Sequence, residues 1–398
     1  MSHSSHENVA TILFLTVLLT ACNGGGEDAD KTPAPRVIPP IVEPSDTSID
    51  QSNDNLDDQA ASSVGINDNN AALIASNAFS LARTSCGLNG LSTDTALENI
   101  ATQHANYIKY VFANSAPTIF NAHYENEIAD IANVTNTNNP FFGGLDLGSR
   151  LSNADYANAR FGAAENIAQS MYYSSAGKLF SSEVMASSMA KSLLAAPYHL
   201  RSLMSPSLYL TGTGMVTYKP YNKDATNNQG YILVNKSAAT QSTKNKTVRG
   251  VFTYPCQGVT DTVTALYNET PDPVKHTGRD LQKDPIGQPI YISVPSARTI
   301  NISNVTFYDV RRNINVPIEL LDYRQDPYKD TANALPENEA FILPITDDFK
   351  SCEGFNSKSK NCGLYGNSEY RVSFDVLIDN EAIERKSFVF KTGAVNEA

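Results

Sequence analysis

The sequence of 398 residues has no tryptophan, so other bulky side chains must fill its cores. It also has only six histidines. Hydrophobic residues make up 41% of the chain, and 19 Tyr and 16 Phe supply the bulky ones. Lys and Arg form no clustered basic face, which a protein needs to bind a phosphate backbone. A nucleic-acid partner is therefore not expected.

The motifs of several common enzyme classes are also missing. The chain has no G-x-S-x-G nucleophile elbow, no phosphate-binding P-loop, no G-x-G-x-x-G turn and no H-E-x-x-H zinc helix. The absence of C-x-x-C excludes zinc ribbons and thioredoxin-type redox sites. Candidates for function must come from less regular patterns.

The acidity of the chain belongs to one stretch near its N-terminus. Residues 23–68 hold ten acids against Lys31 and Arg36, and so carry −8 of the formal net charge of −12. This stretch has few large apolar side chains and cannot bury enough surface to offset the entropy of ordering. It is predicted to be a disordered tether with a reach of roughly 35–40 Å. The nearly neutral remainder is long enough for two globular domains.

Residues 1–22 predict export. Val9 to Leu19 is an uncharged, largely apolar run, too short for a bilayer span of about 20 residues but suited to a signal-peptide core. Leu19-Thr20-Ala21-Cys22 follows and resembles the lipobox of bacterial lipoproteins, in which cleavage leaves the cysteine as a lipidated N-terminus. The leader departs from that pattern in having Glu7 and no Lys or Arg. A plain secretory signal with an incidental Cys22 is the alternative.

The lipoprotein interpretation is favoured because a flexible polar stretch follows Cys22 at once. Several acyl chains on one residue would anchor the protein stably to a membrane. Asn23 resembles the outer-membrane sorting position of Gram-negative lipoproteins. The predicted location is therefore the cell envelope, after secretion across the inner membrane, with a lipid anchor in the outer membrane; the membrane face stays open.

Four cysteines remain outside this leader. Cys352 and Cys362 flank a short polar loop and are expected to pair in an oxidising compartment. By the chain-entropy model, closing so short a loop contributes roughly 2.5–3 kcal/mol. The sequence does not decide whether Cys86 pairs with Cys256.

The chain after the tether divides into two predicted domains, and the fold class is α+β. Helical patterns over 71–83, from Thr95 onward and over 182–195 precede strand-like segments at 212–218 and 230–235, which predicts a layered domain over 69–239. His104 falls in the apolar stripe of the second helix and is interpreted as a packed, hydrogen-bonded core residue. Residues 240–249 are expected to be a hinge.

Residues 250–395 are predicted to form a β-sandwich. Short β-rich segments recur and are separated by Pro, Gly, Asn and Asp. Apolar residues alternate with polar ones over 370–378, and "DNEA" returns the chain to 386–392, so a closing hairpin is expected. No catalytic pattern occurs in this part.

Three spaced signals within the first predicted domain suggest chemistry. His123 opens "HYE", Glu165 lies in "GAAENIAQ", and His199 lies in "PYHLRSLMSP". Each is weak alone, because a histidine at a loop or helix start is more often a surface or capping residue. Tyr124 is interpreted as core filling, and Glu127 as solvent-facing.

In this order the signals resemble the CAP superfamily, also called SCP-like extracellular domains, in its bacterial form. The resemblance covers about 170 residues and includes "NAFSLARTSCGLNGLSTDTALENIATQHANYIK", "NPFFGGLDLGSR", "AENIA" and "LTGTGM". It implies a CAP-type α-β-α layered domain. The second half is similar to the β-rich module that follows bacterial CAP domains and is expected to be Ig-like.

The resemblance implies a cleft lined by two His and two Glu, which holds a divalent metal in some members. His123, Glu165 and His199 match three of the four. The fourth acid is expected on the helix before His199, where this chain reads Leu193-Leu194-Ala195-Ala196. Glu125, or less plausibly Glu183, is the candidate substitute.

Two neutral imidazoles and one carboxylate with an open fourth position make a plausible zinc site, although imidazole also suits other divalent cations. Arg201 is a candidate to hold a carboxylate or an anionic ligand, and the alternative is that it packs the loop.

Three functional hypotheses follow. The leading one is an envelope lipoprotein whose CAP domain binds a ligand or a divalent metal, with the β-sandwich as spacer or docking module. The ligand would be an envelope lipid, a glycan or a protein. The second is a metal-dependent hydrolase with Glu165 or Glu125 as general base. The third is a structural or adhesive surface protein.

Overall fold

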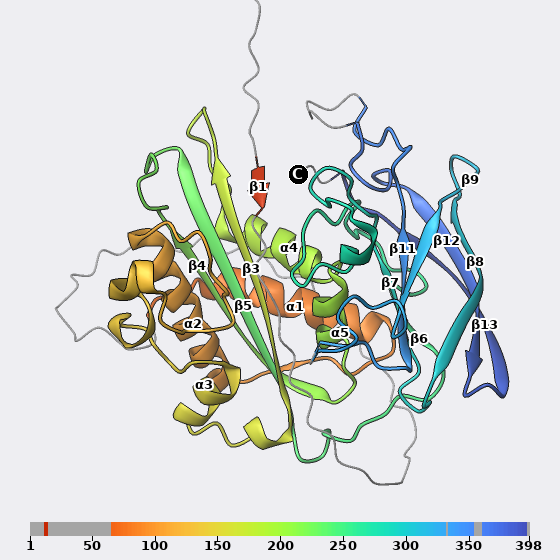
Figure 1. The fold of residues 1–398 in the computed structure, drawn as a ribbon, viewed down its shortest axis with the longest axis horizontal. Helices are drawn as coiled ribbons and strands as arrows, with labels where there is room; N and C mark the ends of the chain where they lie inside the picture. The colour runs from red at the N-terminus through yellow and green to blue at the C-terminus, as the bar shows by residue number, and fades with distance from the viewer. Residues whose placement is uncertain (1–11, 15–64, 332, 354–359, 396–398) are drawn as a thin grey trace, which may run out of the picture.

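The computed structural model describes residues 12–14, 65–331, 333–353 and 360–395. The predicted lipidation site Cys22, with nearly all of the predicted leader and tether, lies outside these residues. The described chain is a mixed α+β protein, as predicted, with largely antiparallel sheets (Figure 1). No described helix has both the length and the apolar character needed to cross a membrane.

The N-terminal half contains a five-stranded sheet in the order β1-β3-β5-β4-β2. Its strands are β1 (Ile12–Phe14), β2 (Ser92–Thr93), β3 (Ala163–Tyr173), β4 (Leu208–Tyr218) and β5 (Asn228–Ala239). Its helices are α1 (Asn69–Ser85), α2 (Thr95–Asn114), α3 (Leu147–Asn153), α4 (Ser182–Leu193) and α5 (Pro197–Leu203), with 3-10 turns η1 (Ala129–Val134), η2 (Asn136–Asn138) and η3 (Ala159–Phe161). Neighbouring strands are antiparallel except β2 and β4.

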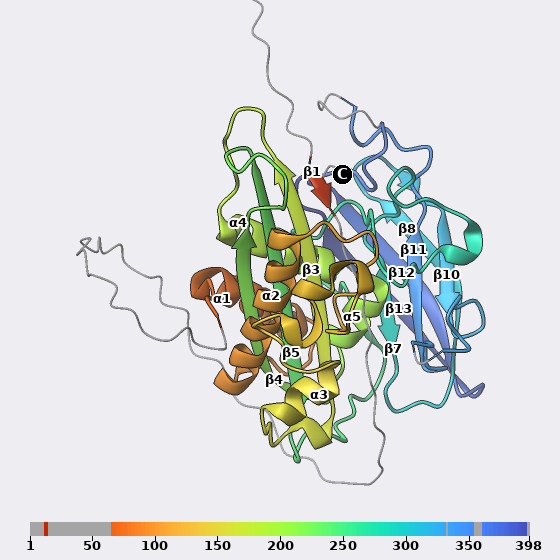
Figure 2. The same ribbon diagram turned by 60° about the vertical axis from the view of Figure 1, so that its left-hand side comes forward.

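Helices cover both faces of this sheet (Figures 1 and 2). On one face, Ala105 and Ile108 of α2 pack with Ile232 and Val234 of β5, while α1, α4 and α5 lie on the other face. The close approach of α2 requires glycine in β4, because a Cβ on Gly214 would lie 2.7 Å from the backbone of Thr102. The "GTG" of β4 is therefore a packing requirement.

Helix α2 begins at Thr95, as predicted. Its N-cap is Asp94, whose Oδ1 accepts a hydrogen bond from the Leu97 N–H at 3.0 Å. The first backbone N–H groups of a helix have no partner within the helix, and a carboxylate at the N-cap accepts a hydrogen bond from one of them. Helix α4 ends at Leu193, two residues before the predicted end, and Ala196 takes the extended conformation that the following Pro197 favours.

The C-terminal half contains two four-stranded sheets, in the orders β10-β11-β7-β6 and β13-β12-β8-β9. The elements are β6 (Phe252–Tyr254), η4 (Lys275–Thr277), β7 (Ile290–Ser293), β8 (Ile300–Asp309), β9 (Ile314–Asn315), β10 (Ile318–Asp322), β11 (Glu339–Pro344), β12 (Glu369–Ile378) and β13 (Ala382–Lys391). The sheets share one core that includes Ile292 and Ile342 from the first and Phe307 and Phe374 from the second.

The predicted closing hairpin is present as β12 and β13, which pair antiparallel along their whole length. The turn residues Asp379 and Asn380 have φ of 51° and 61°. Asp and Asn tolerate this left-handed region better than other residues with a Cβ, and two such residues in succession suit a hairpin turn.

The two halves also share a hydrophobic core. Phe79 and Leu200 from the N-terminal half belong to the same buried cluster as Tyr254, Phe341 and Leu343 from the C-terminal half. Burying apolar surface contributes a free energy of about 25 cal/mol per Å², so this cluster stabilises the packing of the two halves against each other. They therefore pack as one body.

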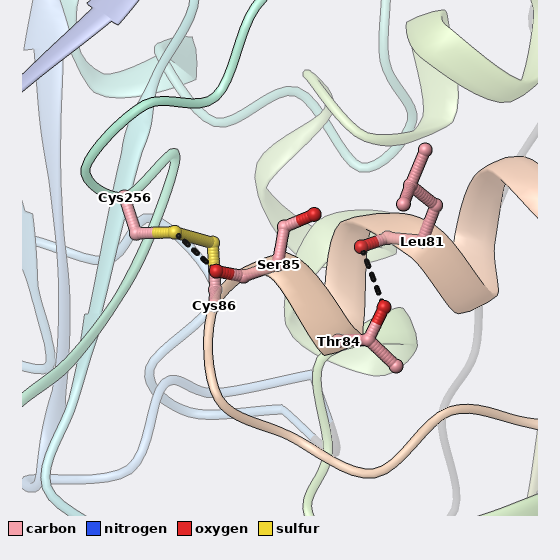
Figure 3. The surroundings of a disulfide bond; sticks show 5 residues. All are labelled: Leu81, Thr84, Ser85, Cys86 and Cys256. Carbon is pink, nitrogen blue, oxygen red and sulfur yellow. Dashed lines mark hydrogen bonds between the residues drawn. A yellow bond between two sulfur atoms is a disulfide. The ribbon is translucent and has the colours of Figure 1, made fainter. Parts of the chain in front are cut away.

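The four described cysteines form two disulfides. Cys352 pairs with Cys362, as predicted, with a Cα–Cα distance of 5.4 Å. Cys86, just after α1, pairs with Cys256, just after β6, with a Cα–Cα distance of 5.6 Å (Figure 3). This second disulfide, which the sequence left open, links the halves covalently.

Candidate functional site

Glu165 lies at the centre of a buried group of charged side chains. Arg150 of α3 donates from Nη2 to both of its carboxylate oxygens, at 2.8 and 3.0 Å, and Lys236 of β5 forms a second ion pair with it. Lys236 is the direct cross-strand partner of Glu165 on β3, which puts both side chains on one face of the sheet. His123 completes the group, with Nδ1 2.8 Å from Glu165 Oε1.

The two cations keep Glu165 ionised. Burial alone would raise the pKa of Glu165, but Arg150 and Lys236, with His104 and His123, hold that pKa well below its usual value. Burial lowers the pKa of Lys236 to about 8, against the attraction of Glu165. The charge of this carboxylate is therefore balanced by the protein's own cations.

Glu125 is fully buried and its two oxygens are both engaged. Oε1 lies 2.6 Å from His104 Nδ1, and Oε2 accepts from the backbone N–H groups of Gly143 and Gly144 at 2.6 and 3.2 Å. His104 Nε2 lies 2.7 Å from the carbonyl oxygen of Ala122, which can only accept, so Nε2 carries a proton. The structure places His104 as the sequence analysis interpreted it, packed and hydrogen-bonded.

His199 of α5 makes its contact with the C-terminal half. Its Nδ1 lies 3.1 Å from Oε1 of Glu269, which is in the segment between β6 and β7. The same oxygen accepts from the backbone N–H groups of Tyr198 at 2.8 Å and His199 at 3.2 Å. Ala196, the residue before the helix, has no side-chain acceptor. Glu269 therefore satisfies the first N–H groups of α5 in place of a local cap.

His123 and His199 have the same arrangement of ring nitrogens. Each has Nδ1 on a carboxylate, and in each Nε2 is buried without a hydrogen-bond partner among the described residues. The rings are close enough for the charge of one to affect the other. Since Glu165 Oε1 and Glu269 Oε1 already accept other hydrogen bonds, Nδ1 carries the proton and Nε2 presents a lone pair.

Both imidazoles are neutral at pH 7. Burial lowers the pKa of His123, although Glu165 opposes the shift. Burial, reinforced by nearby His123, lowers the pKa of His199 well below its usual value. Burial also raises the pKa of Glu269 well above its usual value, against the two backbone donors.

We expect the free energy of unfolding to fall as pH is lowered from 6.5 to 5. The unfolded state protonates His104 and His199 in this range, whereas burial lowers the folded-state pKa of His104 to about 4 and that of His199 well below its usual value, so each contributes a loss of about 1 kcal/mol per pH unit. His123 acts in the same direction, because its pKa is also lowered, and Glu269 acts in the opposite direction, because its pKa is raised. The net slope should be about 1–2 kcal/mol per pH unit, measured by urea unfolding across the range. A flat profile would contradict the neutral state of these imidazoles.

Arg201 binds a carboxylate of the chain itself. Its Nε donates to Oε2 of Glu339, on β11, at 2.7 Å, and both side chains are mostly buried. Burial alone would lower the pKa of Arg201, but Glu339 raises it. Of the two predicted partners for Arg201, a carboxylate or an anionic ligand, the structure has a carboxylate, which joins α5 to the C-terminal half.

The predicted metal set fits in part. Two neutral imidazoles with free Nε2 atoms are suitable donors, and each has the carboxylate behind its Nδ1 that metal-bound histidines usually have. Glu165 lies behind His123 as its hydrogen-bond partner, with its oxygens also bound to Arg150 and Lys236. Within the described parts of the chain, no group of three or more His, Cys, Asp or Glu side chains could hold a metal ion. Among the three predicted ligands, the available donors are therefore the two Nε2 atoms.

A separate open groove of about 600 Å³ lies where α4 meets the C-terminal half. The ion pair between Lys191 and Asp261, at 2.5 Å, lies in it. Its walls combine serine hydroxyls of α4 with apolar side chains such as Val263 and Leu266. Glu183, the second candidate for the missing acid, lines this groove.

Sequence patterns did not indicate roles for Arg150, Lys236 and Glu269. Arg150 lies in the segment "NPFFGGLDLGSR", to which the resemblance assigned no site residue. Lys236 is the one charged residue of the nearly fully buried strand β5, which is a signal for a buried partner. Glu269 is about 70 residues from His199 and carries no local signal.

No family model matches the chain, and the search of curated proteins finds no match either.

Proposed function

We propose that the protein is a cell-envelope lipoprotein that binds a divalent cation between His123 and His199. The observation that supports this most directly is the pair of buried, unpartnered Nε2 atoms, each on an imidazole whose Nδ1 is held by a carboxylate. Burying such an acceptor without a partner costs about 1–3 kcal/mol. A ligand that accepts both lone pairs would recover this free energy.

The proposed fold is a CAP-type domain followed by an Ig-like sandwich. Helices on both faces of the N-terminal sheet and the ordered motifs support the first part. Two four-stranded sheets with a common core support the second. Both disulfides agree with an oxidising compartment, and the lipobox-like Leu19-Thr20-Ala21-Cys22 supports the anchor.

Binding is favoured over hydrolysis. A general base needs a free oxygen within reach of water or substrate, and the oxygens of both candidate bases, Glu165 and Glu125, are occupied by donors of the protein. His123 and His199 are at most 2% exposed, so a polymeric substrate has no direct access to them.

The test is a Zn²⁺ titration of the full chain, followed by thermal unfolding. A ligand at 100 times its Kd stabilises the folded state by about 2.7 kcal/mol, so the wild type should gain several degrees in Tm. The double variant His123→Ala with His199→Ala should show no gain. His276→Ala is the matched control, because His276 is exposed on η4, and it should respond like the wild type.

Loss of the zinc response in the control, or its absence in the wild type, would count against the cation site. In the second case the structural or adhesive alternative gains weight. It has its own support in the shared core and the disulfide between the halves, which suit a rigid surface spacer.

A further inference from the structure

We infer that Glu269 is a positioning residue for the cation site, supplied to His199 by the C-terminal half. This rests on the proposed function and deepens it. Where the fourth acid is expected, just before His199, the chain has the buried apolar residues Leu193 to Ala196, and Glu183 at the start of α4 lines the separate groove. The carboxylate that contacts His199 comes instead from about 70 residues further along the chain.

The contacts of Glu269 orient the ring. One oxygen accepts from Nδ1 of His199 and from the backbone N–H groups of Tyr198 and His199. Ring and helix start are thus held by the same atom, which restricts rotation of the imidazole. The proton is kept on Nδ1, and the lone pair of Nε2 stays available.

The relation of Glu269 to His199 repeats that of Glu165 to His123. In both pairs a buried carboxylate oxygen lies about 3 Å from Nδ1, and Nε2 is left without a partner. Carboxylates behind metal-bound histidines fix the tautomer and raise the basicity of the ligand. The site is therefore symmetrical in chemistry although its parts come from two halves of the chain.

The position of Glu269 is held by neighbouring contacts between the halves. The hydroxyl of Tyr198 donates to Asp326 at 2.7 Å, and Nε2 of Gln288 donates to the carbonyl oxygen of Leu194 at 3.1 Å. The Cys86–Cys256 disulfide ties the start of the same segment to α1. A site shared in this way requires the halves to stay docked.

The test compares Glu269→Gln and Glu269→Leu with the wild type in the full chain. Glutamine keeps an acceptor oxygen but is not an acid, so the affinity for Zn²⁺, measured by calorimetry, should fall about 10-fold. Leucine also removes the acceptor oxygen, so the affinity should fall by up to about 100-fold. Glu339→Gln is the control at the same interface, because Glu339 contacts Arg201 and not His199. It should leave the affinity unchanged.

A second readout uses the metal-free protein. Nitrogen NMR should find the His199 proton on Nδ1 in the wild type and in Glu269→Gln, and lost from Nδ1 in Glu269→Leu. Affinity of Glu269→Gln equal to that of the wild type, or an unchanged tautomer in Glu269→Leu, would overturn the inference. If the wild type binds no Zn²⁺, the proposed function fails, while the tautomer still decides whether Glu269 positions His199. If Glu269→Leu does not fold, the affinity of Glu269→Gln decides.

Discussion

Replacing Glu165 with glutamine should lower the free energy of unfolding by about 3–5 kcal/mol, the usual cost of removing one partner from a buried ion pair. The substitution leaves the guanidinium of Arg150 and the ammonium of Lys236 buried with one anion fewer. Glutamine matches the shape of glutamate, so the loss reports charge and not packing. Urea unfolding at pH 7 measures it.

A double-mutant cycle tests whether this loss comes from the unbalanced charge. Glu165→Gln combined with Lys236→Met restores the balance of charge, since Arg150 keeps Glu125 within 3.7 Å. The double variant should therefore be more stable than Glu165→Gln alone. Lys191→Met removes a solvent-exposed ion pair and should change little. A loss below about 1 kcal/mol for Glu165→Gln would show that water reaches this carboxylate.

Replacing both Cys86 and Cys256 with serine should be the second large effect. The disulfide closes a loop with a sequence separation of 170, for which the chain-entropy model gives about 5 kcal/mol. The same disulfide holds together the two sides of the shared core, so its loss should lower Tm without abolishing the fold. Thermal and urea unfolding of the double variant measure the effect.

The second disulfide provides a matched comparison. Cys352 and Cys362 are separated by only 10 positions, and the same model gives about 3 kcal/mol for their loop. The Cys86–Cys256 variant should therefore be the less stable of the two double variants. The reverse order would mean that the packed core, and not the crosslink, keeps the halves together.

Local patterns predicted most of the secondary structure. The alternation over 370–378 and the turn that follows placed β12 and β13, because the turn residues and the period of two depend only on nearby sequence. The strand β3 was not predicted. It contains Ala163, Ala164 and Ala168, small residues with little strand preference, and it is held in the sheet by its ladder with β5.

The site was harder to predict for a related reason. His123, Glu165 and His199 were found because each lies in a short motif, and the structure brings His123 to Glu165 directly. For Arg201 the sequence left a carboxylate, an anionic ligand and packing of the loop as alternatives, because its partner, Glu339, lies on a distant strand. Side chains that come into contact only when the two halves pack together are not separated by a regular interval in the sequence, so no sequence pattern predicts their contact.

The shared core also determines when folding can be completed. Phe79 and Leu200 are buried against Phe341 and Leu343, and the first N–H groups of α5 are satisfied by Glu269. About 100 residues separate the end of β5 from Leu343. Whether the chain folds during synthesis or after export, its N-terminal half therefore reaches its final packing only once the C-terminal strands are present.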